Sequence, residues 1–253
     1  MKDSVVVATW DGTSEPHLAI DFDQEPRFDL VTFDYSGAQA AARHPRISQL
    51  ISVRTECKGQ IFQHTAAHLA GQNGRYAYVG LIDDDVLVRV SDINRMLHIA
   101  RVFELDSFAP ALSRDSIRNF EHTQRQPDHL LHWVPWVEIM APFYREPLFM
   151  AAAAQFHQST SGWGIDCFLM PLFQKIANMN KVAVIDAVMA THFRPMTSGT
   201  RVFSNGLTAR DELVRLGQWC MRYIAERHPE WIDTEWYRIS YPYTYEKLVG
   251  AST

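Results

Sequence analysis

The chain has 253 residues, of which 47% are hydrophobic and 21% charged, and its formal net charge is −5. A chain of this length and composition can bury the core of one large globular domain. Its lysines and arginines are scattered along an acidic chain, so we expect no basic surface for nucleic acid. No uninterrupted apolar stretch approaches the roughly 20 residues that a membrane-spanning helix needs.

The cysteines and the N-terminal residues point to the same compartment. Cys57, Cys167 and Cys220 are odd in number and far apart in the sequence, which fits reduced thiols better than a disulfide framework. The first residues run directly into a strand-like segment and lack the long apolar core of a secretory signal. We therefore expect a cytoplasmic protein, and peripheral association with the inner face of a membrane is compatible with this.

The first hundred residues alternate between predicted strands and helices. Short apolar runs predict buried strands over residues 4–9, 28–35 and 76–82. Helical spacing of apolar residues predicts helices over 60–71 and 93–100. Such alternation is typical of an α/β protein whose central sheet is mainly parallel.

The second half of the chain is less regular. Residues 108–113 and 131–140 are predicted to be extended, and their prolines suggest sheet edges or bends. Helices are predicted over 148–157, 165–177 and 208–227, and a buried strand over 181–188. An aromatic tail follows the last helix. Because the sequence has no internal repeat and no flexible linker, we expect one compact domain that spans residues 1–253.

Three consecutive aspartates, Asp83, Asp84 and Asp85, follow the apolar run 76–82. Burying an unpaired carboxylate costs roughly several kcal/mol, so the triplet is expected at the carboxyl edge of the sheet, where open α/β folds bind ligands. A hard cation, Mg²⁺ or Mn²⁺, that also holds substrate phosphates is the natural partner of such a cluster. A solvated turn and a helix N-cap are the alternatives, and both stay open at this point.

Two further segments carry residues of interest. Lys58 and Gly59 lie just before a predicted helix, where backbone N–H groups favour a phosphate or a carboxylate. A solvated lysine is the alternative. Residues 161–166 read Ser-Gly-Trp-Gly-Ile-Asp, which predicts a bendable loop that presents Trp163 and places Asp166 at a helix start. Alternatively, Trp163 anchors the core and Asp166 only complements the helix dipole.

A histidine completes the set of candidate residues. His192 lies just past the predicted strand 181–188, from where its imidazole could reach the sheet edge that carries the aspartates. An isolated histidine is more often a structural residue than a ligand.

In this order, the motifs resemble those of nucleotide-sugar-dependent glycosyltransferases of the GT-A type. That family has a strand-terminal Asp-x-Asp motif, a later Gly-Trp-Gly-x-Asp/Glu loop and then a histidine after a further strand. Here the corresponding residues are 83–85, 162–166 and His192. The chain is also similar to an uncharacterised GT-A-like group of plants and bacteria. The resemblance covers about residues 4–195, and the tail from residue 223 falls outside the family pattern.

The resemblance implies a single GT-A-like, Rossmann-like α/β domain with a mixed, mainly parallel sheet flanked by helices. Residues 1–105 would form the half that binds the nucleotide sugar, and 106–205 the half that binds the acceptor and carries catalysis. Residues 206–253 would add the C-terminal helix and the aromatic tail. The implied reaction moves a sugar from a nucleoside diphosphate sugar, most simply a UDP-sugar, to a hydroxyl of a glycan, glycolipid or small molecule.

The resemblance also implies roles for individual residues at the donor site. Asp85 would bind Mn²⁺ or Mg²⁺ directly, with His192 as a further ligand, and Asp83 would face the metal through water or the ribose. The remaining donor contacts would come from residues at the ends of the first strands and from their neighbours: Thr9, Asp11, Asp34, Lys58 and Asp84.

On the acceptor side, Asp166 would be the general base of an inverting reaction. Trp163 and Gly164 would bind the acceptor, with the indole stacking on a sugar ring. Glu138 would contact acceptor hydroxyls or take over the catalytic role.

Three other readings use parts of the same pattern. A nucleotidyltransferase acting on sugar phosphates would normally have a Gly-rich, basic loop after its first strand, and Trp10-Asp11-Gly12-Thr13 matches this poorly. A metal-dependent phosphohydrolase needs more paired ligands. A non-enzymatic carbohydrate-binding protein would use the aromatic residues but gives no reason for the aspartate triplet.

Overall fold

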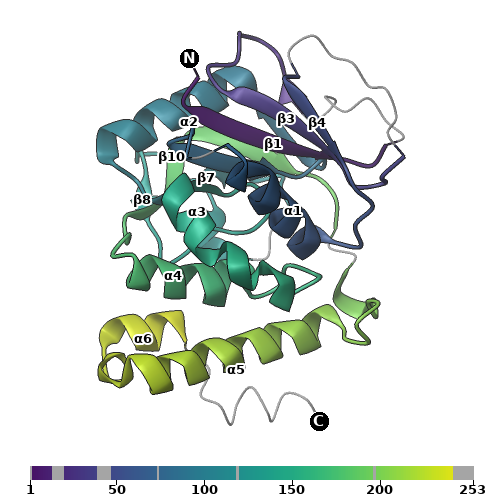
Figure 1. The fold of residues 1–253 in the computed structure, drawn as a ribbon. Helices are drawn as coiled ribbons and strands as arrows, with labels where there is room; N and C mark the ends of the chain where they lie inside the picture. The colour runs from purple at the N-terminus through teal and green to yellow at the C-terminus, as the bar shows by residue number, and fades with distance from the viewer. Residues whose placement is uncertain are drawn as a thin grey trace.

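The computed structural model describes residues 2–12, 20–38, 47–72, 74–117, 120–195 and 198–241 (Figure 1). The strands are β1 (Ser4–Trp10), β2 (Ile20–Asp21), β3 (Asp29–Asp34), β4 (Gln49–Ser52), β5 (Tyr78–Ile82), β6 (Val86–Arg89), β7 (Ser107–Leu112), β8 (His132–Trp133), β9 (Phe143–Arg145) and β10 (Val182–His192). The helices are α1 (Lys58–Ala70), α2 (Val90–Phe103), α3 (Glu146–Ala152), α4 (Met170–Ile176), α5 (Ala209–Arg227) and α6 (Glu235–Ser240). A π-helical turn, Ile165–Leu169, precedes α4.

The strands form one mixed, mainly parallel sheet in the order β2-β6-β10-β7-β9-β5-β1-β3-β4, with β8 paired to β10. Strand β1 lies inside the sheet and pairs in parallel with β3 on one side and β5 on the other. Parallel strands end at the same sheet edge. The residues that follow β1 and β5, Asp11 and Asp83, therefore start from one edge.

Two antiparallel insertions shape this edge. Strand β9 runs between β5 and β7. A Cβ atom at Gly80 of β5 would lie 2.3 Å from the Phe143 ring of β9, so the close approach of this ring to β5 requires glycine at position 80. Strand β6, directly after the aspartate triplet, pairs antiparallel with the end of β10 and sets His192 opposite Val86. The triplet and the histidine are thereby brought together by strand pairing.

Each face of the sheet packs on its own core. Along β1, Val5 and Val7 belong to one buried cluster, and Val6 and Ala8 belong to the other, as strand alternation requires. Figure 1 shows α1, α3 and α4 on one face of the sheet and α2 on the other, with α5 and α6 as an outer layer next to α4. The first core continues from the sheet through α3 to Leu216 and Ile224 of α5.

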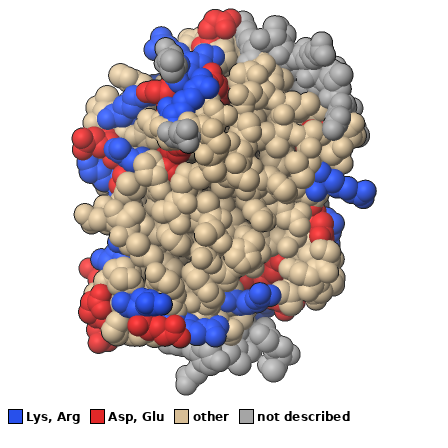
Figure 2. All heavy atoms as spheres, in the orientation of Figure 1, with Lys and Arg blue, Asp and Glu red and all other residues tan. Residues whose placement is uncertain are grey.

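The exposed side of the outer layer is polar. Figure 2 shows acidic and basic side chains interleaved along this layer, whereas the middle of this face, directly above the layer, carries few charges. Helix α6 includes part of the aromatic tail. The tail contacts α4 through Lys175, whose ammonium lies over the rings of Trp231 and Trp236. Residues 242–253 lie outside the described residues.

The expected fold class is confirmed, and so are the main strands and helices of the sequence prediction. Two expectations need correction. Strand β7 lies inside the sheet despite Pro110, because β9 pairs only with Ser107 and Phe108 and the proline lies beyond that pairing. Of residues 131–140, only His132 and Trp133 form a strand. Strands β2, β4, β6 and β9 were not predicted.

Candidate functional site

A cavity of about 320 Å³ lies at the carboxyl edge of β1, β3 and β5. Most of the residues that the sequence analysis selected line it: Thr9, Lys58, Asp83, Asp84, Asp85, Glu138, Trp163 and His192. They come from segments that are far apart in sequence, and the sheet topology accounts for their meeting. Such a concave polar site at the strand ends is where α/β sheets bind ligands.

The aspartate triplet is not a solvated turn. The side chains of Asp83, Asp84 and Asp85 are only 25%, 18% and 19% exposed. The Lys58 ammonium contacts the Asp83 carboxylate. Burial raises the pKa of Asp83 to about 6 although Lys58 opposes the shift. Asp83 is therefore engaged with an amino group in this structure.

Asp84 is held by three different groups. The Tyr35 hydroxyl donates to Oδ2 at 3.0 Å, and the Arg194 guanidinium lies 3.4 Å from the same oxygen. The backbone N–H of Asp84 donates to the Thr9 hydroxyl at 3.0 Å. Burial still raises the pKa of Asp84, with the hydroxyl and the guanidinium opposing it. These contacts fix the triplet relative to β1 and β3.

Asp85 is the member that remains available to a cation. Its Oδ1 is buried and has no hydrogen-bond partner among the described residues. Its Oδ2 lies 3.5 Å from Nε2 of His192. A buried carboxylate oxygen without a donor is costly, so the position of this oxygen fits direct contact with a cation.

His192 is oriented as a metal ligand would be. Its Nδ1 lies 2.7 Å from the carbonyl oxygen of Ile117, which can only accept, so Nδ1 carries the hydrogen. The neutral ring then presents the lone pair of Nε2 towards Asp85. A backbone carbonyl that fixes the tautomer in this way is the usual outer-sphere partner of a metal-bound histidine.

The donor set fits a hard divalent cation that also binds substrate. The set consists of the Asp85 carboxylate and the His192 imidazole, and Mg²⁺ or Mn²⁺ commonly completes such a set with substrate phosphates and water. Within the described parts of the chain, no group of three or more His, Cys, Asp or Glu side chains is arranged so that it could hold a metal ion by itself. When the ring is protonated, Nε2 also carries a hydrogen and can donate to Asp85, and this hydrogen bond raises the pKa of His192.

The loop that carries Trp163 is tightly built. Gly162 and Gly164 have φ values of +90° and +87°, which glycine adopts without strain. A side chain at Gly162 would lie 2.9 Å from the Ile139 side chain and 3.1 Å from Cβ of Lys58. The loop therefore packs directly against Lys58, and Ser161 and Trp163 line the cavity.

The two candidate acids of the acceptor side have different surroundings. Glu138 is buried and lines the cavity. Asp166 is buried behind Ile139, whose N–H donates to Oδ2 at 3.3 Å, and it does not line the cavity itself. Burial raises the pKa of Asp166 to about 6, and backbone N–H groups of Cys167 and Ile139 moderate the shift.

Besides Asp166, three selected residues lie away from the cavity lining. Asp34 is fully buried, and its carboxylate accepts from the Ser36 N–H at 2.9 Å and from the Ser52 hydroxyl at 2.6 Å. Gly164 packs under α5, where a side chain would lie 3.2 Å from Leu216. Asp11 lies close enough to raise the pKa of Asp84 through its charge, without lining the cavity.

Tyr35, Thr55 and Arg194 line the cavity and were missed by the sequence analysis. Thr55 follows β4, and its hydroxyl is buried without a hydrogen-bond partner among the described residues. Tyr35 follows Asp34 directly, and Arg194 follows His192 by two residues. Their positions after strand ends are the signal that could have identified them.

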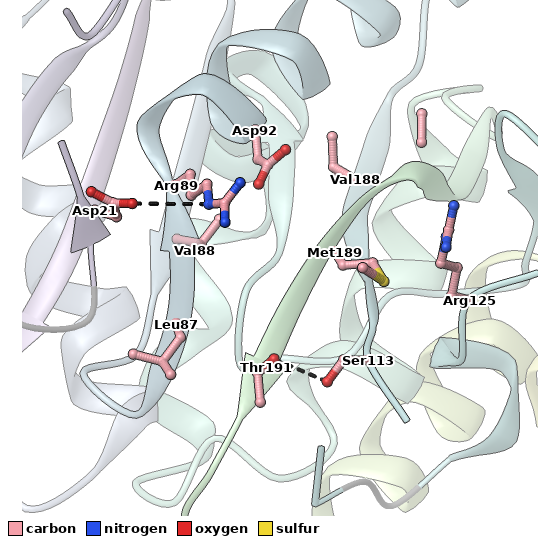
Figure 3. A pocket seen from close by; sticks show the side chains of 11 residues that line it. Asp21, Leu87, Val88, Arg89, Asp92, Ser113, Arg125, Val188, Met189 and Thr191 are labelled. Carbon is pink, nitrogen blue, oxygen red and sulfur yellow. Dashed lines mark hydrogen bonds and ion pairs between the residues drawn. The ribbon is translucent and has the colours of Figure 1, made fainter. Parts of the chain in front are cut away.

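A larger hollow of about 510 Å³ lies on the other face of the β6–β10 pair (Figure 3). Thr191 lines this hollow whereas His192 lines the cavity, because successive strand residues point to opposite faces. Figure 3 shows Arg89 and Arg125 on opposite sides, with Arg89 3.9 Å from Asp21. None of the described residues that line this hollow has a buried side-chain oxygen without a hydrogen-bond partner, whereas Asp85 and Thr55 of the cavity do, so the cavity remains the candidate site.

No known family matches the sequence, and no curated protein matches it. Solved structures of TarS from S. aureus resemble the fold. TarS residues 1–349 in complex with UDP-GlcNAc match with a TM-score of 0.57 at 11% identity, covering 93% of this chain and 68% of that one. A longer TarS structure matches with a TM-score of 0.52 at 12% identity, covering 93% of this chain and 46% of that one.

The complex of TarS 1–349 with UDP matches with a TM-score of 0.50 at 13% identity, covering 92% of this chain and 74% of that one. At such identities the likeness shows the fold: an α/β protein with a mixed, mainly parallel sheet flanked by helices. The chain spans less than half of the longer TarS structure. Within the described residues, none of the helices combines the length and apolarity that a membrane crossing requires.

Proposed function

We propose that the protein is a metal-assisted glycosyltransferase that moves a sugar from a UDP-sugar to a hydroxyl of a carbohydrate or glycolipid. The observation that carries the proposal is the Asp85–His192 pair, with its buried unpartnered oxygen, in a cavity that also holds the cations Lys58 and Arg194. The fold shared with TarS, which has been solved with UDP-GlcNAc and with UDP, supports the choice of donor.

The nucleoside would lie against the ends of β1, β3 and β4. Thr9 and Tyr35 line that part of the cavity, and the buried hydroxyl of Thr55 would gain its missing partner from a base or ribose group. Asp11 would contact the same part of the donor. Asp34 would act from behind, by holding the turn that follows β3.

The diphosphate would lie between Lys58 and Arg194. Both cations already pair with aspartates of the triplet, and a bound diphosphate would compete for them. Asp85 and His192 would hold a divalent cation, which would stabilise negative charge on the departing diphosphate. Asp83 would face the ribose or reach the same cation through water.

The acceptor would enter beside Trp163 and Glu138. The acceptor hydroxyl would attack the anomeric carbon while the bond from that carbon to the diphosphate oxygen breaks, and its proton would pass to a carboxylate. We propose Asp166 for that role, as the acid that directly follows the Trp163 loop; because it is buried behind Ile139, the proton would have to pass this residue to reach it. Glu138, which lines the cavity, would bind acceptor hydroxyls and is the second candidate for the base.

Calorimetric titration with UDP, GDP and CMP, each with and without Mn²⁺, tests the donor site. We expect binding of UDP that strengthens with Mn²⁺, and a screen of UDP-sugars for released UDP would then identify the donor. Binding of a nucleoside triphosphate together with a sugar phosphate would favour a nucleotidyltransferase. Binding of glycans with no nucleotide binding would favour a carbohydrate-binding protein.

A further inference from the structure

Helix α5 lies outside the sheet and its flanking helices, yet one of its side chains reaches the loop that lines the cavity. Glu212 in the first turn of α5 is fully buried. Its Oε1 accepts from the N–H of Thr160 at 2.9 Å, and its Oε2 accepts from the N–H of Ser161 at 2.7 Å. A carboxylate is therefore committed to two successive backbone donors of the loop.

Two side chains also donate hydrogen bonds to the Glu212 carboxylate. The side-chain amide of Asn205 donates to Oε1 at 2.6 Å, and the Ser159 hydroxyl lies 3.4 Å from Oε2. Burial alone would raise the pKa of Glu212, but these donors outweigh it and the pKa is lowered. The side chain therefore stays ionised, and hydrogen bonds to a buried charged acceptor are the strong ones.

The held segment leads directly to the cavity. The carbonyl oxygen of Thr160 accepts from the N–H of Gly59 at 3.0 Å, so this peptide is held by α5 from one side and by α1 from the other. A side chain at Gly59 would lie 1.6 Å from the carbonyl oxygen of Ser159, which shows how closely the two segments approach. Ser161 and Trp163 then line the cavity beside Lys58.

We infer that Glu212 is the positioning residue that holds the Trp163 loop in its cavity-lining conformation, which makes α5 part of the functional unit. Glu212 touches neither the cavity nor the proposed substrates, so it acts through Thr160 and Ser161. Its effect on turnover rests on the proposed function, whereas its effect on the loop does not.

The test compares two neighbouring acids on one helix. Glu212→Gln preserves size but turns an amide NH₂ group towards the backbone donors. Asp211→Asn is the matched control, because Asp211 forms the capping box of α5 with Thr208 and does not contact the loop. Hydrogen exchange of peptide 159–164 is measured for both variants, together with Tm, UDP affinity in Mn²⁺, and kcat and KM for the UDP-sugar.

For Glu212→Gln we expect faster exchange at Thr160 and Ser161 by about tenfold or more, since hydrogen bonds to a charged acceptor are lost. We expect kcat to fall by about tenfold while KM for the donor and the affinity for UDP change little, because the loop faces the acceptor. Asp211→Asn should lower Tm and leave loop exchange and kcat nearly unchanged. Unchanged loop exchange in a folded Glu212→Gln variant, or equal acceleration in both variants, would overturn the inference.

Two further arms keep the result interpretable. If Glu212→Gln does not fold, Asn205→Ala takes its place. This substitution removes the hydrogen bond that the exposed Asn205 side chain donates to Glu212, and it should accelerate hydrogen exchange of the loop to a smaller extent. If loop exchange accelerates as expected but no nucleotide binds to the unmodified protein, the positioning role stands and the proposed function fails.

Discussion

The Lys58 ammonium and the Asp83 carboxylate form an ion pair between the first turn of α1 and the end of β5. The pair places a cation and an anion in the wall of one cavity. A diphosphate that binds there would draw Lys58 away from Asp83, so donor binding and the protonation of Asp83 should be linked.

Lys58→Met should therefore weaken UDP binding in Mn²⁺ by about tenfold or more, because a charge-assisted contact with the diphosphate is lost. Lys175→Met is the control, since Lys175 lies over Trp231 and Trp236, away from the cavity. Calorimetry at pH 7.5 gives both affinities. Equal affinity of the Lys58→Met variant and the unmodified protein would remove Lys58 from the donor site.

Asp85→Asn should abolish the strengthening of UDP binding by Mn²⁺, with a loss of about 100-fold in metal-dependent affinity. The neutral amide retains the shape of the side chain but is a poor ligand for a hard cation. Asp115→Asn, an exposed site, should behave like the unmodified protein. Retained manganese dependence in Asp85→Asn would show that the cation is held elsewhere.

Asp166→Asn should lower the transfer rate by about 100-fold or more while UDP affinity stays within a few-fold, as expected when a general base is lost. Glu138→Gln should act mainly on KM for the acceptor. The pH profile of kcat should rise through about 6, the pKa of Asp166, because the base must be ionised. Should Glu138→Gln lose the larger share of kcat, the base would be Glu138.

The raised pKa of Asp166 also makes a prediction about stability. A carboxyl with a pKa of about 6 in the folded state binds its proton more tightly there than in the unfolded chain, where its pKa is about 3.9. Its contribution to stability is present below pH about 4 and is lost as the pH rises to about 6.

Asp166→Asn removes this dependence. Between pH 4.5 and 7.5 the free energy of unfolding of the variant, relative to that of the unmodified protein, should therefore rise by about 2 kcal/mol. Urea unfolding at the two pH values measures the difference, and the titration of Asp83 cancels because both proteins contain it. A constant difference would mean that Asp166 titrates normally.

Gly59→Ala should destabilise the protein by about 2–4 kcal/mol, because its methyl group would lie 1.6 Å from the carbonyl oxygen of Ser159. Gly71→Ala at the other end of α1 is the matched control, since the nearest atom to its methyl group lies 3.5 Å away. Thermal and urea unfolding compare the two variants. Similar stabilities would contradict the close approach of α1 and the Trp163 loop.

The parts of the site that could be predicted from sequence are those in which chemistry and position are local. The aspartate triplet ends a buried strand, and the loop around Trp163 carries two glycines and an acid within a few residues. Both line the cavity as their strand-end and loop positions suggest. Lys58 was identified for a similar reason, because it precedes a helix.

What could not be predicted depends on pairing across the sheet. Arg194 reaches Asp84 because β10 runs antiparallel to β6, and no pattern in the sequence specifies that pairing. Tyr35 and Asp34 are neighbours in the sequence, yet Tyr35 lines the cavity, whereas the Asp34 carboxylate accepts a hydrogen bond from the backbone N–H of Ser36. Glu212 lies in a helix whose sequence is that of an ordinary amphipathic segment. The role of this residue depends on its hydrogen bonds with the Trp163 loop, which the sequence does not predict.

Strand β9 has a consequence for any attempt to divide the chain. This three-residue segment joins the part of the sheet built by β1, β3, β4 and β5 to the part built by β7 and β10, and its Phe143 fills the space left by Gly80. A fragment that stops near residue 105 would expose the backbone of β5 along an apolar edge, a surface prone to aggregation. Split versions of the protein should consequently depend on reassembly of both pieces rather than on independent stability of either.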